Sequence, residues 1–154
     1  MALEIERKFL VEKRLIPVSA RNIRIIQYYL CTDPERTVRI RLADERAFLT
    51  VKGRGNGLVR PEYEYPIPAA DARAMMSLAV STPVEKVRRE LIVGGKKWEV
   101  DFFEGENSGL VLAEIELERE DEEIVLPEWI DREVTGDWRY HNSFLSRHPY
   151  RQWI

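Results

Sequence analysis

The chain has 154 residues, of which 44% are hydrophobic and 33% are charged, against roughly 25% charge in an average domain. Its 24 Lys and Arg nearly balance its 27 Asp and Glu, and the net charge of −3 excludes a strongly basic nucleic-acid surface and an acidic disordered tail. The N-terminus is too charged for a signal peptide, and no apolar run reaches the roughly 18 residues of a membrane span. We therefore expect one cytoplasmic domain over residues 1–154, with no nucleic-acid or membrane partner; an oligomer is left open.

Alternation of apolar and polar residues dominates the chain up to residue 118. A period of two is the pattern of a β-strand, because successive side chains point to opposite faces. Turn signals separate several segments, and Gly94-Gly95 is typical of a two-residue hairpin loop. The predicted strands span residues 4–11, 24–30, 37–42, 47–52, 59–67, 84–93, 97–103 and 110–118.

Helical patterns occupy the remaining segments. Residues 68–80 predict a helix with Pro68 near its start. The tail from about residue 121 is interpreted as short helices, one opened by Pro127 and another capped by Asp137 or Asn142. The predicted fold class is α+β, with eight strands and helices packed outside them. The apolar stripe of the first helix is expected to contain Met75, Met76, Leu78 and Ala79.

Cysteine and histidine are scarce. Cys31 is the single cysteine, so an internal disulfide is excluded, and its position between a strand and a turn predicts a buried or half-buried structural thiol. His141 and His148 are the two histidines, so a zinc site of the usual His and Cys type is not expected.

Charged residues follow one another on a single face of nearly every predicted strand. In the first strand Glu4, Glu6 and Lys8 lie on one face, and Ile5 and Phe9 on the other. Like charges two residues apart on a strand are about 7 Å apart and repel each other, so they oppose folding unless a counter-ion or ligand relieves them. Such pairs are Glu4/Glu6, Arg39/Arg41, Glu62/Glu64, Lys86/Arg88 and Glu114/Glu116.

The two kinds of charge suggest a ligand. Carboxylate pairs suit hard divalent cations such as Mg²⁺, while Arg and Lys suit phosphate oxygens, so together they suit a polyphosphate carried with its metal. An eight-stranded barrel has room inside for one small ligand. If the charged face turns inward, the helix at residues 68–80 and the C-terminal pieces would cover the apolar outer face. The alternative is an open sheet whose charged face meets water or a partner protein.

The residues Glu4-Ile5-Glu6-Arg7-Lys8 resemble the N-terminal E-x-E-x-K signature of the CYTH family, also called triphosphate tunnel metalloenzymes. The resemblance implies a closed eight-stranded antiparallel β-barrel, a tunnel with a charged interior and helices packed outside. It extends through an ordered set of motifs: Arg39-Ile-Arg41, Thr50-Val-Lys52, Glu62-Tyr-Glu64, Glu85-Lys86-Val-Arg88, Val100-Asp101 and Glu114-Ile-Glu116.

The resemblance also implies roles for individual residues. Lys86 corresponds to a lysine that helps to activate the attacking water, and Tyr29, in preference to Tyr28, lies where relatives carry a tyrosine near it. Carboxylates that bind or neighbour Mg²⁺ or Mn²⁺ are Glu4, Glu6, Glu62, Glu64, Asp101, Glu114 and Glu116. Cations that hold the triphosphate are Lys8, Arg39, Arg41, Lys52 and Arg88.

The tail departs from the family pattern. Relatives often place a lysine from the last helix over the tunnel, whereas this chain offers Arg139 or His141, or no such contact. Arg60 and Glu99 share the charged face with a weaker match, and a structural role is equally open for them. The four tryptophans are interpreted as outer packing: Trp98, Trp129, Trp138 and Trp153.

The predicted function is metal-dependent hydrolysis of a triphosphate, with inorganic tripolyphosphate as the first choice of substrate. A class IV-type adenylate cyclase and a thiamine triphosphatase share the same grip on the triphosphate, and a non-catalytic module that binds nucleotide or polyphosphate is a further alternative. The short chain and the stretch Glu85-Lys86-Val-Arg88 favour the phosphatase. The grip alone does not determine which end of the substrate reacts.

Overall fold

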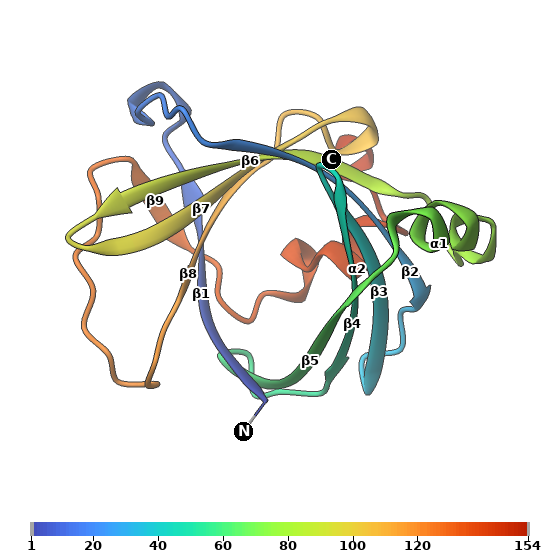
Figure 1. Ribbon diagram of the computed structural model, residues 1–154. Coiled ribbons are helices and arrows are strands. Elements are labelled where there is room, and N and C mark those ends of the chain that lie inside the picture. The colour runs from blue at the N-terminus through green and yellow to red at the C-terminus, as the bar shows by residue number, and fades with distance from the viewer. Residues whose placement is uncertain (1, 154) are drawn as a thin grey trace.

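In the computed structural model, which describes residues 2–153, the alternating segments close into an antiparallel barrel (Figure 1). Neighbouring strands follow the order β5-β4-β3-β2-β6-β7-β8-β1, and β1 also pairs with β5, which closes the ring of eight. The short strand β9 adds to the other end of β1. The strands are β1 Leu3–Val11, β2 Asn22–Cys31, β3 Arg36–Ala43, β4 Arg46–Gly53, β5 Val59–Ile67, β6 Val84–Val93, β7 Lys96–Phe103, β8 Val111–Glu116 and β9 Ile130–Glu133.

The eight predicted strands are confirmed, with ends that differ by one or two residues. Gly94 and Gly95 both have positive φ, as the predicted two-residue hairpin loop between β6 and β7 requires. The loop between β3 and β4 carries no glycine. There Asp44 takes the left-handed conformation, with φ of 52°, which Asp adopts more readily than most residues.

The helix after β5 is confirmed and lies outside the wall formed by β3 and β4 (Figure 1). Helix α1 spans Ala69–Ala74 and continues as a 3₁₀ turn over Met75–Leu78, with Pro68 at the N-cap. Met75 and Met76 pack on the core beneath, but Leu78 is 63% exposed. Its assignment to the apolar stripe was wrong, because the tighter 3₁₀ turn rotates it away from the barrel.

The prediction for Pro127 is also wrong. Residues after Pro127 turn back by a hydrogen bond from Ile130 N to Pro127 O and enter β9 instead of a helix. Strand β5 pairs only with Leu3–Ile5 of β1, so the same edge of β1 would otherwise leave backbone groups unpaired near Phe9 and Val11. Strand β9 satisfies them.

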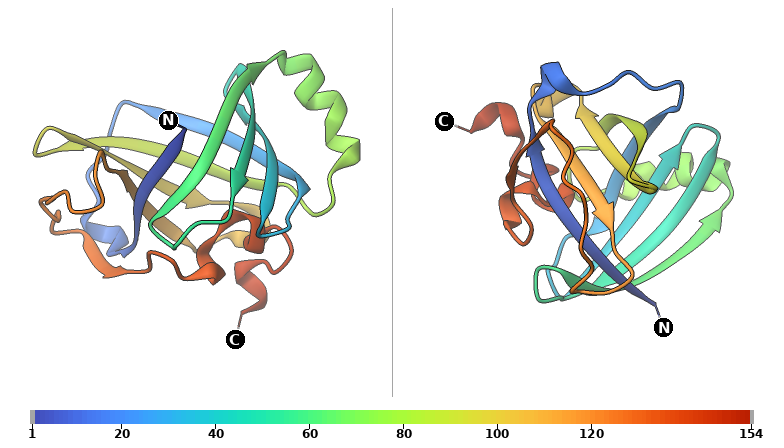
Figure 2. Two further views of the ribbon diagram at one scale, coloured as in Figure 1. Left: turned by 90° about the horizontal axis from the view of Figure 1, so that it is seen from below. Right: turned by 90° about the vertical axis from the view of Figure 1, so that its left-hand side faces the viewer.

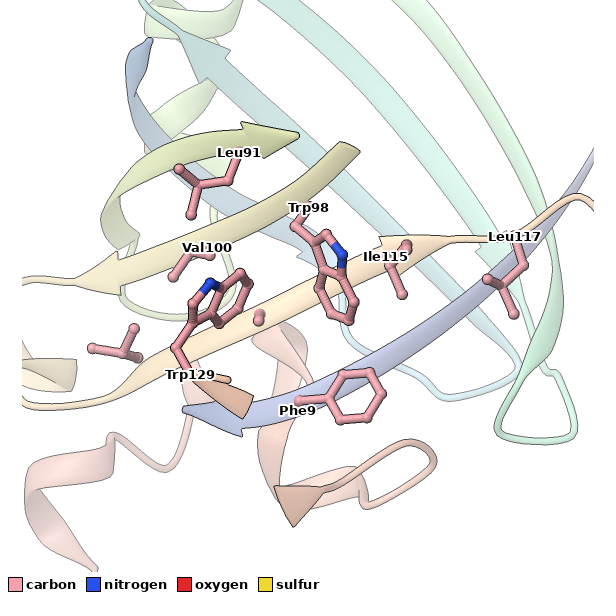
Figure 3. Close-up of a cluster of buried hydrophobic side chains, with 9 residues drawn as sticks. Phe9, Leu91, Trp98, Val100, Ile115, Leu117 and Trp129 are labelled. Atoms are coloured by element: carbon pink, nitrogen blue, oxygen red, sulfur yellow. The ribbon is translucent and has the colours of Figure 1, made fainter. Parts of the chain in front are cut away.

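Two apolar clusters cover the outside of the barrel. In one, Trp98 packs against Phe9 and Trp129, with ring centroids 5.5 Å apart in both pairs (Figure 3). The other lies under α1, where the buried Tyr28 hydroxyl donates to the carbonyl of Ala72. Outward-facing strand residues make up most of both clusters, with Trp129 and Ala72 added from outside the strands, so the apolar face of the alternation does turn outward.

A third apolar cluster fills one end of the barrel from inside. Phe103 lies opposite Lys86 and Leu112 opposite Asp101, and directly opposed residues share a face, so this cluster belongs to the lumen. The C-terminal segment closes it with Tyr140 and Leu145 (Figure 2). The C-terminal pieces were expected to cover the outer face, and residues around Trp129 do so; the segment around Leu145 instead plugs the inner face, which is itself apolar at this end.

Short elements build this C-terminal plug. The Asp137 carboxylate caps a 3₁₀ turn over Trp138–Tyr140 by accepting from the backbone N–H of Arg139, as predicted. Helix α2 spans Asn142–Leu145, so Asn142 is its first residue and not its cap. Within residues 2–153, no helix is long and apolar enough to cross a membrane.

Candidate active site

The barrel encloses a cavity of about 330 Å³ lined almost wholly by charged and polar side chains. Strand register creates it: Glu6 lies opposite Glu116, and Lys52 opposite Glu62, so each pair points inward together. Thirteen of the predicted site residues line the cavity: Glu4, Glu6, Lys8, Tyr29, Arg39, Arg41, Lys52, Glu62, Glu64, Lys86, Arg88, Glu114 and Glu116.

Asp101 differs from the other predicted site residues. Its carboxylate is fully buried behind the cavity wall, where Arg88 donates two hydrogen bonds of 2.8 and 2.9 Å and Lys86 Nζ lies 2.7 Å away. Burial alone would raise the pKa of Asp101, but Arg88 and Lys86 outweigh it and lower that pKa to about 2. Asp101 is thus an ionised anchor that holds two cations at the cavity surface.

Lys86 lies at the inner end of the cavity, next to the apolar plug. Its Nζ contacts Asp101 and the Oδ1 of Asn142 at 2.9 Å, and stands 5.3 Å from the centre of the Phe103 ring. Complete burial, reinforced by the nearby Arg88, outweighs the attraction of Asp101 and lowers the pKa of Lys86 to about 7. This amine can therefore lose and regain a proton near neutral pH.

The cavity also crowds its arginines. Burial together with Arg39 and Arg88 lowers the pKa of Arg41 to about 9. Arg39 is buried, its Nη2 donates to the Thr50 hydroxyl at 3.2 Å, and its Nε has no hydrogen-bond partner among residues 2–153. A buried donor without an acceptor is costly, and an anion in the cavity would relieve both the crowding and the unmet donor.

Carboxylates near β1 are crowded in the same way. Burial and Glu114 raise the pKa of Glu6 well above its usual range, and burial and Glu4 raise that of Glu62 to about 6. Glu62 shares a hydrogen bond with Glu4, and Glu6 with Glu114. Lys52 adds partial relief, since its Nζ lies 3.0 Å from Glu4 and 3.4 Å from Glu62.

These carboxylates fit a divalent cation. Within residues 2–153 no three His, Cys, Asp or Glu side chains stand ready in a metal-binding arrangement. Instead, burial and the neighbouring carboxylates raise the pKa of Glu6 and of Glu62, and a bound cation would supply the positive charge that these groups need. Oxygen donors of this kind are the ligands that Mg²⁺ and similar hard cations prefer.

The structure separates the alternatives that the sequence left open. Tyr29 lines the cavity, whereas Tyr28 faces outward under α1. Arg139 is turned away and holds Asp137, whereas His141 lines the cavity. Burial, with Lys8 and other nearby cations, lowers the pKa of His141 to about 4, so it is neutral at pH 7. Arg60 and Glu99 also line the cavity.

Sequence reasoning missed two amides. Gln27 and Asn142 contact Arg41 and Lys86 inside the barrel, although Asn142 had been considered only as a helix cap. Gln27 could have been found from its position, because it lies two residues before Tyr29 in the same strand and therefore on the same face. No pattern in the sequence placed Asn142 at the tunnel.

A second cavity, of about 540 Å³ and mainly apolar, adjoins the charged one. Trp138, Phe144 and His148 line it; the Phe144 and His148 rings stack with centroids 4.4 Å apart, and Trp138 meets Phe144 edge-on at 4.7 Å. Residues that line both cavities are Thr37, Gly57, Arg60, His141 and Ser143.

A closed antiparallel barrel with acidic and basic side chains in its lumen defines a class of protein that binds a multivalent anion together with a metal cation. A family model described as the CYTH domain matches residues 2–141, and the chain belongs to the CYTH family. The triphosphate tunnel metalloenzymes of this family depend on a metal ion.

Two relatives match over nearly their whole length. An inorganic triphosphatase of Acetivibrio thermocellus is 44% identical over 98% of this chain and 97% of its own length, and one of Nitrosomonas europaea is 35% identical over 93% and 96%. The crystal structure of the inorganic triphosphatase NE1496 superposes with a TM-score of 0.67 at 32% identity, covering 98% of this chain and 99% of that one. A proposed adenylate cyclase of Bacillus halodurans, at 18% identity and a TM-score of 0.58 over 79% and 84% of the two chains, shares the fold.

Proposed function

We propose that this chain is a metal-dependent inorganic triphosphatase that hydrolyses tripolyphosphate to pyrophosphate and phosphate. The observation that carries the proposal is the single cavity in which crowded arginines, crowded carboxylates and the buried amine of Lys86 face one another. The two relatives described as inorganic triphosphatases support it. The proposal treats residues 1–154 as one domain that works in the cytoplasm. With a single cysteine the chain forms no internal disulfide, which suits a compartment that keeps thiols reduced.

The cations of the cavity bind and orient the substrate. The guanidinium groups of Arg39, Arg41 and Arg88 line the cavity and neutralise charge at the phosphoryl groups. Lys8 and Lys52, which hold Glu114 and Glu4, would complete the grip once a metal ion took their place beside these carboxylates.

Carboxylates near β1 and β5 would hold the cation, which we take to be Mg²⁺ or Mn²⁺. Bound there, it neutralises phosphate oxygens and helps to align the triphosphate. Asp101 is not among the residues that line the charged cavity, so in this proposal it orients Lys86 and Arg88 and does not ligate the metal. The ligand set is drawn from Glu4, Glu6, Glu62, Glu64, Glu114 and Glu116.

Lys86 acts as the general base. As a water oxygen forms its bond to the terminal phosphorus, the neutral amine accepts the proton of that water. The bond from phosphorus to the bridging oxygen breaks, and its electron pair leaves with the oxygen as pyrophosphate. Tyr29, on the same cavity wall, offers a hydroxyl to orient the water. The plug behind Lys86 keeps bulk water from its far side.

A substrate panel tests the proposal. Phosphate release from tripolyphosphate, ATP and thiamine triphosphate is measured with Mg²⁺ and with Mn²⁺, while cyclic AMP is assayed in parallel. We expect tripolyphosphate to have the highest kcat/KM and phosphate to be the product from every substrate. Cyclic AMP as the main product from ATP would instead establish the cyclase, and binding without turnover would establish a binding module.

The phosphate grip predicts stabilisation by substrate. A ligand at 100 times its Kd stabilises a folded protein by about 2.7 kcal/mol, which is a Tm increase of roughly 5–10 °C at this size. We expect such an increase with Mg²⁺ and tripolyphosphate, and a much smaller one in Arg39→Ala. Arg24→Ala is the matched control, since Arg24 is exposed and paired with Glu104 outside the cavity. An unchanged Tm of the unaltered protein at millimolar tripolyphosphate contradicts a tunnel site.

The second cavity favours a second substrate class, triphosphates that carry an aromatic group. Its aromatic wall adjoins the charged cavity, so an organic group attached to a bound triphosphate can reach Trp138. Stacking of one base contributes about 1–3 kcal/mol, so Trp138→Ala is expected to raise KM for ATP or thiamine triphosphate at least about fivefold. KM for tripolyphosphate, measured in the same assay, should not change. An equal change of KM for all three substrates would contradict a role for the second cavity in binding an organic group.

A further inference from the structure

Two buried amides connect the phosphate grip to the general base. The Nε of Arg41 donates to Gln27 Oε1 at 2.9 Å, and Gln27 Nε2 donates to Asn142 Oδ1 at 2.8 Å. The same Asn142 oxygen accepts from Lys86 Nζ at 2.9 Å. Gln27 and Lys86 are completely buried, whereas Arg41 and Asn142 are half-buried where they line the charged cavity.

Arg41 determines which group donates and which accepts in each of these three hydrogen bonds. A guanidinium is only a donor, so Gln27 must present its carbonyl oxygen to Arg41 and its amide N–H groups to Asn142. Asn142 in turn must present its oxygen to Gln27, and that oxygen then faces Lys86 as an acceptor. The side chain of Asn142 therefore cannot offer Lys86 an N–H group without breaking its bond to Gln27.

This arrangement orients the amine. A neutral lysine has two N–H donors and one lone pair, arranged tetrahedrally. Asn142 Oδ1 and the Asp101 carboxylate are both acceptors, at 2.9 and 2.7 Å from Nζ, so they occupy both donors. The lone pair then points in the direction that neither acceptor occupies. On that side Lys86 faces the Phe103 ring and the charged cavity, which Lys86 lines.

We propose that Asn142, held by Gln27, is a positioning residue that directs the lone pair of Lys86 toward the water-binding part of the tunnel. The inference rests on the proposed triphosphatase function, in which Lys86 is the base. Asn142 supplies this contact from the C-terminal plug, so the plug takes part in the reaction as well as closing the barrel. Asn142 also lines the charged cavity, so the double variant described below separates an effect through Lys86 from a direct contact with the substrate.

The test is Asn142→Leu, which keeps the size of the side chain and removes the acceptor. We expect kcat for tripolyphosphate to fall about 10–100-fold, the range found for groups that orient an active residue from behind, with KM within about twofold. Gln27→Glu is the second variant: it still accepts from Arg41 but has no N–H for Asn142, so kcat falls with little change in KM. Asn22→Leu is the control, because the Asn22 side chain is exposed and, within residues 2–153, bonds only to the carbonyl of Ser19.

Combination with Lys86→Ala separates a positioning role from a structural one. If Asn142 acts through Lys86, Asn142→Leu causes no further loss of kcat once Lys86 is absent. A further loss in the double variant, or an unchanged kcat in both Asn142→Leu and Gln27→Glu, overturns the inference while leaving the triphosphatase function intact. An unaltered protein that does not hydrolyse tripolyphosphate overturns both.

Discussion

Lys86→Ala is expected to lower kcat for tripolyphosphate hydrolysis by about 10²–10⁴-fold, the usual contribution of a general base, while tripolyphosphate affinity changes little. Lys52→Ala, which removes part of the phosphate grip, should lose affinity as well as turnover. Phosphate release and calorimetric binding, measured on both variants, give the comparison. Equal losses of affinity would reduce Lys86 to one more phosphate contact.

The same residue predicts the pH dependence of turnover. The neutral amine is the active form, so below the free enzyme's pKa of about 7 kcat/KM should fall about tenfold for each pH unit, and above it kcat/KM should level off. In Lys86→Ala this acid limb should disappear from the residual activity. An acid limb that persists unchanged in the variant would assign the titration to another group.

Glu6→Gln is expected to lower activity about 100-fold or more, since even groups behind a metal ligand contribute about 10–100-fold. Affinity for Mg²⁺ or Mn²⁺, measured by calorimetry, should fall with it. Glu120→Gln, at an exposed position away from the tunnel, is the control. A doubly substituted Glu4→Gln, Glu6→Gln protein with full activity would sink the assignment of these carboxylates to the metal.

The metal-free protein should respond in the opposite direction. Because burial and Glu114 raise the pKa of Glu6, the folded protein holds this proton more tightly than the unfolded chain does. Stability is therefore lost as pH rises above the carboxyl's unfolded pKa, and Gln, which cannot ionise, removes that loss. In the presence of a chelator at pH 7, Glu6→Gln should have a higher Tm than the unaltered protein. A lower Tm would show that Glu6 has a structural role.

Most of the fold and of the candidate site could be predicted from the alternation of apolar and polar residues. Every inward-facing charged position of β1, β3, β4 and β5 was predictable because a strand has only two faces, and like charges on one face need a common ligand. The same rule assigned Phe9 and Trp98 to the outer core, whereas the preference for Tyr29 over Tyr28, its neighbour on the opposite face, came from the family resemblance.

What the sequence did not reveal depends on where chain segments meet. Strand β9 exists because β5 leaves part of one edge of β1 unpaired, which no local pattern near residue 130 indicates. Asn142 approaches Lys86 because the apolar inner surface around Phe103 and Leu112 draws in the C-terminal segment. Both features follow from packing between distant parts of the chain, to which periodicity is insensitive.

The pairing of β1 also determines when the enzyme can become active during its synthesis. This strand precedes the other eight strands in the chain, yet its partners lie at residues 59–61, 112–116 and 130–133. Phe9 cannot pack on Trp98 until that residue emerges from the ribosome, and pairing over such separations is slow. Because β1 both closes the ring and carries Glu4, Glu6 and Lys8, barrel closure and active-site assembly are one late event. A nascent chain that stops before residue 111 has neither.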